Sequence, residues 1–318
     1  MKITLLLVTI LYAINVNAQF LEDVWELDEL NVLGETEAYP YLTNDGLRLY
    51  FTNDEGGTNN LYISSRTDLS ADFEPKQIVD TVFSGLTGCW LTVDELDAYY
   101  TSGASLFHSS RTTTSSAFSI GTEISLVGGA INPFLGGVSL VPGGAELYVY
   151  NTSDLVKYTY TNDTSYTFAS NVTLPLAGFD AAIAQLSKDG LELYWTLAPI
   201  GADSNYMFKL DRPSLSDDFT NPVKVNDLIN ASAAYNSQGS YASAANVLVW
   251  VRNDNGLWYG NDLFIAQGGS ASVTELTSGP KELLKIVDLL GRETKFKPNT
   301  ALIYMYTDGS IEKIYVID

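Results

Sequence analysis

A pair of carboxylates is the first arrangement in this sequence that could carry out chemistry. Glu37 and Asp180 each stand just ahead of a short apolar segment without charge, residues 39–42 and 183–186. Two carboxyl groups about 5–10 Å apart, one protonated and one ionised, can hydrolyse a glycosidic bond. The pair therefore indicates a glycoside hydrolase as an alternative function, if the fold brings both residues to the mouth of one channel.

The single histidine and the single cysteine are weaker candidates for catalysis than this carboxylate pair. His108 could serve a Ser/His/Asp triad, but its place in the sequence repeat is held elsewhere by Ile63 and Lys157, so we expect a structural or solvent-facing role. Cys89 has no second cysteine with which to form an internal disulfide. A reactive thiolate needs a nearby cation, and we expect a buried, inert thiol instead. One His and one Cys also exclude zinc sites built from these ligands, and we predict no metal site.

Two loops carry candidate binding residues. The segment 53–60, Asn-Asp-Glu-Gly-Gly-Thr-Asn-Asn, is rich in oxygen ligands, which makes calcium conceivable, but it lacks the alternating Asp spacing of a calcium loop. We expect a plain hairpin there and no cofactor. Trp258 and Tyr259 lie among Asn and Gly residues in a later loop, where exposed rings could stack on a sugar or dock a protein.

A repeat of about fifty residues must position these side chains. Each copy has an Asp/Gly turn, an apolar-aromatic strand, a polar loop, a second strand and a third strand opened by Phe. The turns begin at Asp45, Asp94, Gly143 and Asp189, and a looser fifth copy covers residues 247–265. In three copies an Arg precedes the Phe by seven residues: Arg66 and Phe73, Arg111 and Phe118, Arg212 and Phe219. A small apolar strand precedes each turn, so each copy holds four strands.

Four antiparallel strands at this period are typical of one blade of a β-propeller. The sequence therefore predicts an all-β, five-bladed propeller whose innermost strands are residues 39–42, 89–91, 138–140, 183–186 and 241–242. Residues 24–30 look like a fourth strand without its first three, so we expect the N-terminal strand to complete the last blade and close the ring, which hides two sheet edges. The alternative strand for that place is residues 272–276.

The repeat resembles the WD-like propeller repeats of the TolB type, on Pro40, Asn44-Asp45-Gly46 and the following Leu-Arg-Leu-Tyr-Phe to Phe51. The resemblance covers roughly residues 24–270, and blades 2, 3 and 5 lack the Pro or the full Asp-Gly turn. It implies a scaffold that binds proteins or glycans and does not imply one reaction.

Both ends of the chain look like transport signals. Residues 1–18 have a basic start, an apolar run and a small residue at a cut site, as in a secretory signal peptide. Residues 281–318 resemble the C-terminal sorting signal of type IX secretion, but are shorter than that domain. The resemblance rests on a short list of positions: Asp288, Leu290, Gly291, Arg292, Tyr304, Gly309 and Lys313. Three plain strands beside the propeller are the alternative. The expected organisation is signal peptide 1–18, propeller 19–270, linker 271–280 and sorting segment 281–318.

The composition of the chain restricts the classes of partner that it could bind. The 318 residues carry 17 Lys and Arg against 38 Asp and Glu, a formal net charge of −21. This charge argues against nucleic acid and anionic lipid, and no apolar run after residue 18 is long enough to span a membrane. We expect an exported, non-catalytic binding module for a glycan or a protein, secreted or at the cell surface after passing the periplasm, with the secretion machinery as partner of the tail.

Overall fold

The computed structural model describes most of the chain. It describes Leu21 and residues 23–129, 137–150, 154–173, 178–200, 205–225, 229–230, 235–253, 261–268, 283–288, 292–295, 300–306 and 311–315. The chain divides into unit 1, Met1–Gly269, and unit 2, Ser270–Asp318. Within the described residues the only helical segment is the short 3-10 turn η1, Glu55–Gly57, and no helix is long and apolar enough to cross a membrane.

The strands of unit 1 form four-stranded antiparallel sets, which we call blades. Blade 1 contains β2 (Glu37–Leu42), β3 (Arg48–Asn53), β4 (Asn60–Ser65) and β5 (Gln77–Ile78). Blade 2 contains β6 (Gly88–Leu91), β7 (Asp97–Ser102), β8 (Ser105–Ser110) and β9 (Thr122–Val127). Blade 3 contains β10 (Val138–Leu140), β11 (Glu146–Tyr150), β12 (Leu155–Asn162) and β13 (Ser165–Asn171).

Blades 4 and 5 complete the arrangement. Blade 4 contains β14 (Phe179–Leu186), β15 (Glu192–Pro199), β16 (Tyr206–Asp211) and β17 (Thr220–Lys224). Blade 5 contains β18 (Tyr235–Ala242), β19 (Val247–Asn253), β20 (Asp262–Gln267) and, at its outer edge, β1 (Asp23–Glu26). The innermost strands contact one another in ring order, β2 with β6, β6 with β10, β10 with β14, β14 with β18, and β18 again with β2. The predicted all-β propeller fold is confirmed.

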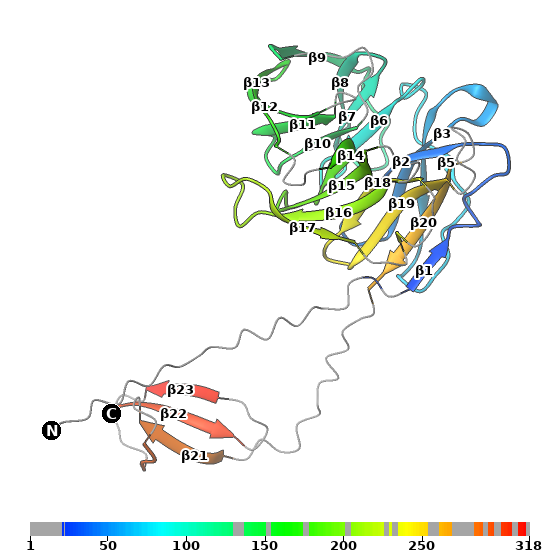
Figure 1. Cartoon of the computed structure of the whole chain (residues 1–318). Helices are drawn as coiled ribbons and strands as arrows, with labels where there is room; N and C mark the ends of the chain where they lie inside the picture. The colour runs from blue at the N-terminus through cyan, green and yellow to red at the C-terminus, as the bar shows by residue number, and fades with distance from the viewer. Residues whose placement is uncertain are drawn as a thin grey trace. The chain divides into compact units, whose positions relative to one another are not determined.

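The predicted N-terminal closing strand is also confirmed. β1 pairs antiparallel with β20, with Val24 opposite Ala266 and Trp25 opposite Ile265, although the two strands come from opposite ends of unit 1 (Figure 1). Leu27 and Leu30, directly after β1, are buried in the same core as β3 and β19. The alternative closing segment, residues 272–276, lies outside the described residues.

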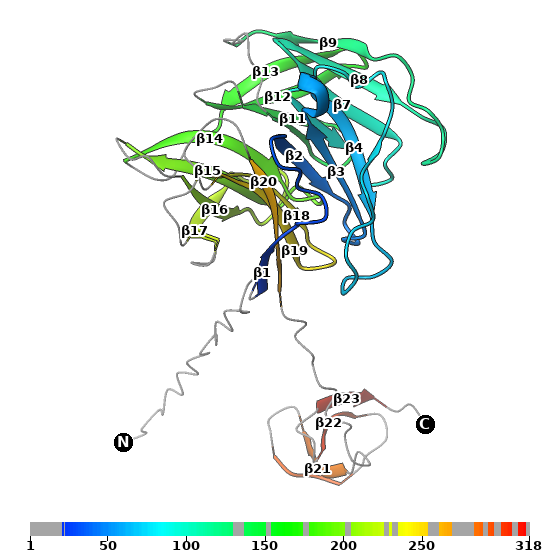
Figure 2. The same cartoon turned by 90° about the vertical axis from the view of Figure 1, so that its right-hand side faces the viewer.

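Two features differ from the sequence prediction. Phe73, Phe118 and Phe219 do not open the outer strands, because β5, β9 and β17 begin one to four residues later. In addition, the outer strands of blades 2 and 3 pair with each other: β13 runs parallel to β9, which joins the two blades into one eight-stranded sheet (Figures 1 and 2). Nothing in the repeat pattern indicated this pairing.

Each blade has two ends, which we name for use below. The turn face is the end where the innermost strand turns into the second strand, as at Asp45-Gly46 between β2 and β3. The loop face is the opposite end, where the innermost strands begin and the loops between the second and third strands lie. In blade 1, Glu37 at the start of β2 pairs with Asn53 at the end of β3, so both are at the loop face.

Unit 2 is a three-stranded antiparallel sheet. Its strands are β21 (Leu283–Asp288), β22 (Ala301–Tyr306) and β23 (Ile311–Tyr315), with β22 in the middle. Val287 and Leu302 are its buried apolar residues among those described. The sheet provides the short β tail that the sequence predicts.

Candidate functional site

The turn face is built from a recurring aspartate turn. In blade 1, Asp45 Oδ1 accepts hydrogen bonds from the Thr43 hydroxyl at 2.6 Å and from the Leu47 amide at 3.0 Å. Asp94 and Asp189 accept equivalent bonds in blades 2 and 4. These side chains hold the local backbone, as is usual for Asp in a turn.

The repeated Arg and Phe form a clamp on this turn. The guanidinium carbons of Arg66, Arg111 and Arg212 lie 4.7, 4.4 and 4.5 Å from the ring centroids of Phe73, Phe118 and Phe219. Each Arg Nε donates to the carbonyl oxygen of the residue after the turn Asp, at 2.7–2.8 Å. The seven-residue spacing therefore places a cation over an aromatic face.

In two places the clamp also connects neighbouring blades. Arg111 of blade 2 donates to the hydroxyl of Tyr50 in blade 1 at 3.1 Å. Arg212 of blade 4 donates to the hydroxyl of Tyr148 in blade 3 at 3.0 Å and lies 3.6 Å from the Glu146 carboxylate. The crevice between blades 1 and 2 is further filled by the buried Glu95, which accepts a hydrogen bond from Tyr50 at 2.6 Å and pairs with Arg48.

The contact between blades 2 and 3 lacks these fillers. Gly144 stands in the turn position of Glu95, and Tyr160 stands where blades 1, 2 and 4 have the Arg, with the same backbone bond back to the turn. The Tyr160 side chain is exposed, and its hydroxyl bonds Asp163 instead. The Tyr166 hydroxyl donates a hydrogen bond to the carbonyl oxygen of Gly144 at 2.9 Å, the bond that the Arg Nε makes in blades 1, 2 and 4. A neutral hydroxyl thus replaces the guanidinium.

A groove of about 570 Å³ lies at this contact on the turn face. One wall comes from blade 2, with Trp90, Asp94, Asp97 and Tyr99, and the other from the turn of blade 3, residues 140–144. Grooves of about 350 Å³ and 460 Å³ follow the contacts of blade 3 with blade 4 and of blade 5 with blade 1. The groove between blades 2 and 3 is larger and extends inward to the innermost strands β6 and β10. We call it the blade 2/3 groove.

The floor of this groove contains a buried lysine. Lys188, in the turn of blade 4, is only 3% exposed, and its Nζ lies 3.3 Å from the ring centroid of Tyr41 and 4.3 Å from that of Trp90. Its remaining described partner is the Ser240 hydroxyl at 3.5 Å. Burial lowers the pKa of Lys188 well below its usual range, whereas the two ring faces favour the cation. Lys188 thereby connects residues of blades 1, 2, 4 and 5 near the propeller axis.

His108 belongs to a recurring cross-strand pair. Its Nε2 lies 2.7 Å from Asp97 Oδ1, and its ring packs on Tyr99. Lys157 with Glu146 in blade 3 and Lys209 with Glu192 in blade 4 make the same diagonal contact between the second and third strands. Such pairs stabilise antiparallel strands, so His108 has the structural environment that we expected.

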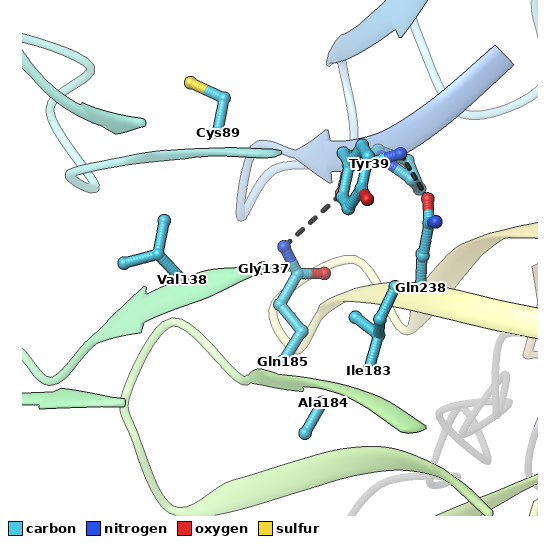
Figure 3. Close-up of a pocket in the computed structure, with 9 residues that line it drawn as sticks. Tyr39, Cys89, Gly137, Val138, Ile183, Ala184, Gln185 and Gln238 are labelled. Atoms are coloured by element: carbon cyan, nitrogen blue, oxygen red, sulfur yellow. Dashed lines mark hydrogen bonds between the residues drawn. The ribbon is translucent and has the colours of Figure 1, made fainter. Parts of the chain in front are cut away.

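Among the described residues, side chains of the innermost strands meet near the propeller axis. Tyr39, Cys89, Ile183, Gln185 and Gln238 surround a space of only about 10 Å³ (Figure 3), about the volume that one water centre requires. The Tyr39 amide donates to Gln238 Oε1 at 2.5 Å, and Gln185 Nε2 donates to the Pro40 carbonyl at 3.4 Å. Burial raises the pKa of Cys89 to about 12, so this thiol stays protonated.

The carboxylate pair lies on the loop face. The sequence placed Glu37 and Asp180 just ahead of the inner strands, but both lie inside them, because β2 begins at Glu37 and β14 at Phe179. Glu37 is fully buried, and its Oε1 accepts a hydrogen bond from Asn53 at 2.7 Å. Burial raises the pKa of Glu37 to about 7, against the lowering effect of Lys76. Asp180 is opposite Ala198 in its sheet, and nothing is described of its side chain, so the catalytic pair stays a prediction.

The loop at residues 53–60 uses its oxygen atoms internally. Asp54 Oδ1 accepts a hydrogen bond from the Thr36 amide at 2.6 Å, and Glu55 Oε2 accepts one from the Tyr62 hydroxyl at 2.8 Å. Among the described residues no group of three His, Cys, Asp or Glu could hold a metal ion. Trp258 and Tyr259 lie outside the described residues, so their role in binding stays a prediction.

The sorting residues are partly placed. Asp288 ends β21 opposite Leu302, Tyr304 lies in the central strand opposite Ile286, and Lys313 lies on β23 opposite Ile303. Arg292 follows β21 and is exposed. Leu290, Gly291 and Gly309 lie outside the described residues.

The sequence reasoning missed the residues of the blade 2/3 groove. A signal existed in the repeat itself, because aligning its copies puts Gly144 against Glu95 and Tyr160 against Arg111. The sequence contained no such signal for the contact of Lys188 with Tyr41 and Trp90. The residues at the same position of the first three copies are shorter and uncharged: Asn44, Val93 and Pro142.

Comparisons with known proteins place the chain among remote structural neighbours. No family model matches, and no curated protein matches. A putative TolB from Agrobacterium tumefaciens is 14% identical, with 88% of this chain and 80% of that chain covered and a TM-score of 0.41. A putative glycoside hydrolase from Parabacteroides distasonis is 12% identical, with 72% and 86% covered and a TM-score of 0.45.

A putative 6-phosphogluconolactonase from Bacteroides uniformis is 11% identical, with 87% of this chain and 71% of that chain covered and a TM-score of 0.39. Similarity at this level assigns neither a family nor an activity to the chain. Its function has to come from its own residues.

Proposed function

We propose that this chain is an exported, non-catalytic β-propeller that binds a glycan or protein ligand in the blade 2/3 groove. The observation that carries the proposal is the missing filler: the contact between blades 1 and 2 is packed by Glu95 and Arg111, whereas Gly144 and Tyr160 leave a groove of about 570 Å³ between blades 2 and 3. Its volume and its mixed aromatic and polar lining suit a small segment of a larger ligand.

The test compares two matched substitutions. Val93 is 60% exposed and lines the groove, so Val93→Trp should fill it, whereas Val32, 40% exposed, lies after β1 and does not line it. The chain from residue 19 is applied to an array of polysaccharides and to immobilised surface proteins of the producing cells. We expect the bound ligand to be lost with Val93→Trp and retained with Val32→Trp. Equal binding by both variants would remove the groove from the function.

A glycoside hydrolase that uses Glu37 and Asp180 is the second candidate. The observation in its favour is the pKa of about 7 at Glu37, since a general acid must stay protonated near neutral pH. The full burial of Glu37 counts against it. Glu37→Gln and Asp180→Asn should each abolish any glycan cleavage if the pair is catalytic, and a wild-type chain that cleaves no glycan on the array rejects this candidate.

We further propose that the signal peptide delivers the chain to the periplasm and that residues 281–318 direct it onward to the cell surface or the medium. The supporting observation is the Asp288, Arg292, Tyr304 and Lys313 pattern on a separate three-stranded unit. Deleting residues 281–318 should leave the protein in the periplasm, as measured by fractionation and immunoblotting. Normal export of the shortened chain would contradict the sorting role.

A further inference from the structure

The chain contains its own example of what the blade 2/3 groove lacks. Between blades 3 and 4, Glu146 and Tyr148 at the start of β11 receive Arg212: the guanidinium lies 3.6 Å from the carboxylate and 3.0 Å from the hydroxyl. The Tyr148 hydroxyl donates to Glu146 Oε2 at 3.0 Å, which completes a closed set of charge-assisted contacts.

The blade 2/3 groove carries the same receiving pair without the arginine. Asp97 and Tyr99 occupy the positions of Glu146 and Tyr148 on the second strand, and both line the groove. Asp97 pairs with His108, just as Glu146 pairs with Lys157, but the residue in the Arg position is Tyr160. Tyr99 interacts with the hydroxyl of Tyr166.

We propose that the blade 2/3 groove receives an arginine side chain of a protein partner beside Asp97 and Tyr99, the counterparts of the Glu146 and Tyr148 that Arg212 contacts between blades 3 and 4. This inference rests on the proposed function and names the ligand chemistry of that site. The guanidinium would approach Asp97 and Tyr99 from the turn face, with its alkyl stem along the apolar wall formed by Val141 and Pro142.

The charges at the groove favour a cation at its mouth. Asp94 is exposed there, the Asp97 side chain is 38% exposed, and the whole chain has a net charge of −21. Lys188 opposes a second cation, but it lies at the floor between Tyr41 and Trp90. The cation site is therefore at the outer part of the groove, beside Asp97.

Arginine fits this place better than lysine does. The guanidinium is planar and presents several donors at once, so that it can contact a carboxylate and a hydroxyl while one face stacks on an aromatic ring. Arg212 makes all three kinds of contact, with Glu146, Tyr148 and Phe219. A lysine ammonium is a compact charge and would make fewer of these contacts.

The experiment titrates the chain from residue 19 with four capped tripeptides, Ala-X-Ala, in which X is arginine, citrulline, lysine or glutamate. Citrulline keeps the shape of arginine without its charge. Binding is measured by calorimetry and by chemical-shift changes at low salt. We expect the arginine peptide to bind at millimolar or lower concentration and at least tenfold more tightly than the citrulline peptide, with affinity falling as salt rises.

Two variants test the location. Asp97→Asn removes the carboxylate charge and should weaken the arginine peptide at least tenfold, while Asp68→Asn, an exposed site on another blade, makes the same charge change without effect. The double variant Gly144→Glu with Tyr160→Arg rebuilds the filler that Glu95 and Arg111 provide. Glu95 itself has φ +60°, close to the +69° of Gly144, so the chain already holds a glutamate in this backbone conformation at the equivalent turn position. We expect this variant to bind no peptide.

The remaining outcomes decide against the inference. No binding of the arginine peptide at 10 mM, equal binding of the citrulline peptide, or unchanged affinity in Asp97→Asn overturns it. Preference for the glutamate peptide would assign the groove to an anion at Lys188 and also overturns it. If Val93→Trp still removes the natural ligand in any of these cases, the groove function stands and only its arginine specificity fails. If Val93→Trp changes nothing, the proposed function itself fails.

Discussion

The buried carboxylate of Glu37 leads to a prediction about how stability depends on pH. Glu37 is fully buried at the loop face of blade 1, accepts a hydrogen bond from Asn53, and has its pKa raised by burial from 4.5 to about 7. The substitution Glu37→Gln keeps the shape and an acceptor for Asn53 but cannot ionise. Comparing the two proteins therefore isolates the ionisation of this one group.

The magnitude follows from the two pKa values. Between pH 4.5 and 7 the folded chain binds a proton at Glu37 that the unfolded chain has lost, so folding stability falls as pH rises through this window. The full penalty is present above pH 7 and absent below pH 4.5. The rise in the pKa of Glu37 from 4.5 to about 7 corresponds to roughly 3 kcal/mol, since each tenfold change in proton affinity is worth about 1.4 kcal/mol. The Glu37→Gln variant does not carry this penalty.

Urea unfolding between pH 4 and pH 8.5 measures the effect. We expect the free energy of unfolding of Glu37→Gln, relative to the wild type, to increase by up to about 3 kcal/mol from the lowest to the highest pH. Glu74→Gln, which removes an exposed carboxylate of the same blade, is the control and should show no such trend. Parallel curves for the wild type and Glu37→Gln would show that Glu37 ionises normally in the fold, and the reasoning from its burial would be wrong.

Three further perturbations test the packing of the propeller. Arg111→Met removes two hydrogen bonds and a cation–π contact with Phe118, so we expect a loss of about 2–4 kcal/mol by urea unfolding; a loss below about 0.5 kcal/mol would contradict the clamp. We expect the gain in unfolding free energy of Lys188→Met over the wild type to be largest near neutral pH and to shrink toward pH 10.5. The reason is that a lysine whose pKa is lowered by folding makes the wild type more stable as pH rises over that window. A pH-independent difference would refute this. Removing residues 20–33 takes away β1 and the buried Leu27 and Leu30, so calorimetry should show a melting temperature at least about 10 °C lower; an unchanged value would mean that β1 does not close the ring.

Much of the fold could be predicted because it is repeated along the chain. Two of the features that define a blade act between residues a few positions apart: the turn chemistry and the alternation of apolar and polar residues along a strand. The periodicity of the sequence therefore reveals both, as at Asp45, Asp94 and Asp189. The closing role of residues 23–26 followed from counting strands, since the last blade lacked one. The Arg and Phe spacing was visible as well, but its purpose, a cation held over a ring and tied to a turn, was not.

The sequence indicated the candidate site only in part, through Gly144 and Tyr160, and the rest was beyond its reach for a physical reason. The blade 2/3 groove depends on what faces what between neighbouring blades: Gly144 and Tyr160 leave space only because Asp97 and Tyr99 of another blade stand opposite them. Lys188 matters because the ring brings it to Tyr41 and Trp90, more than ninety residues away in the chain. The local sequence pattern determined that the chain forms blades and that its first strand completes the last blade. The contacts between neighbouring blades exist only in the closed ring, and these contacts decided where the groove lies.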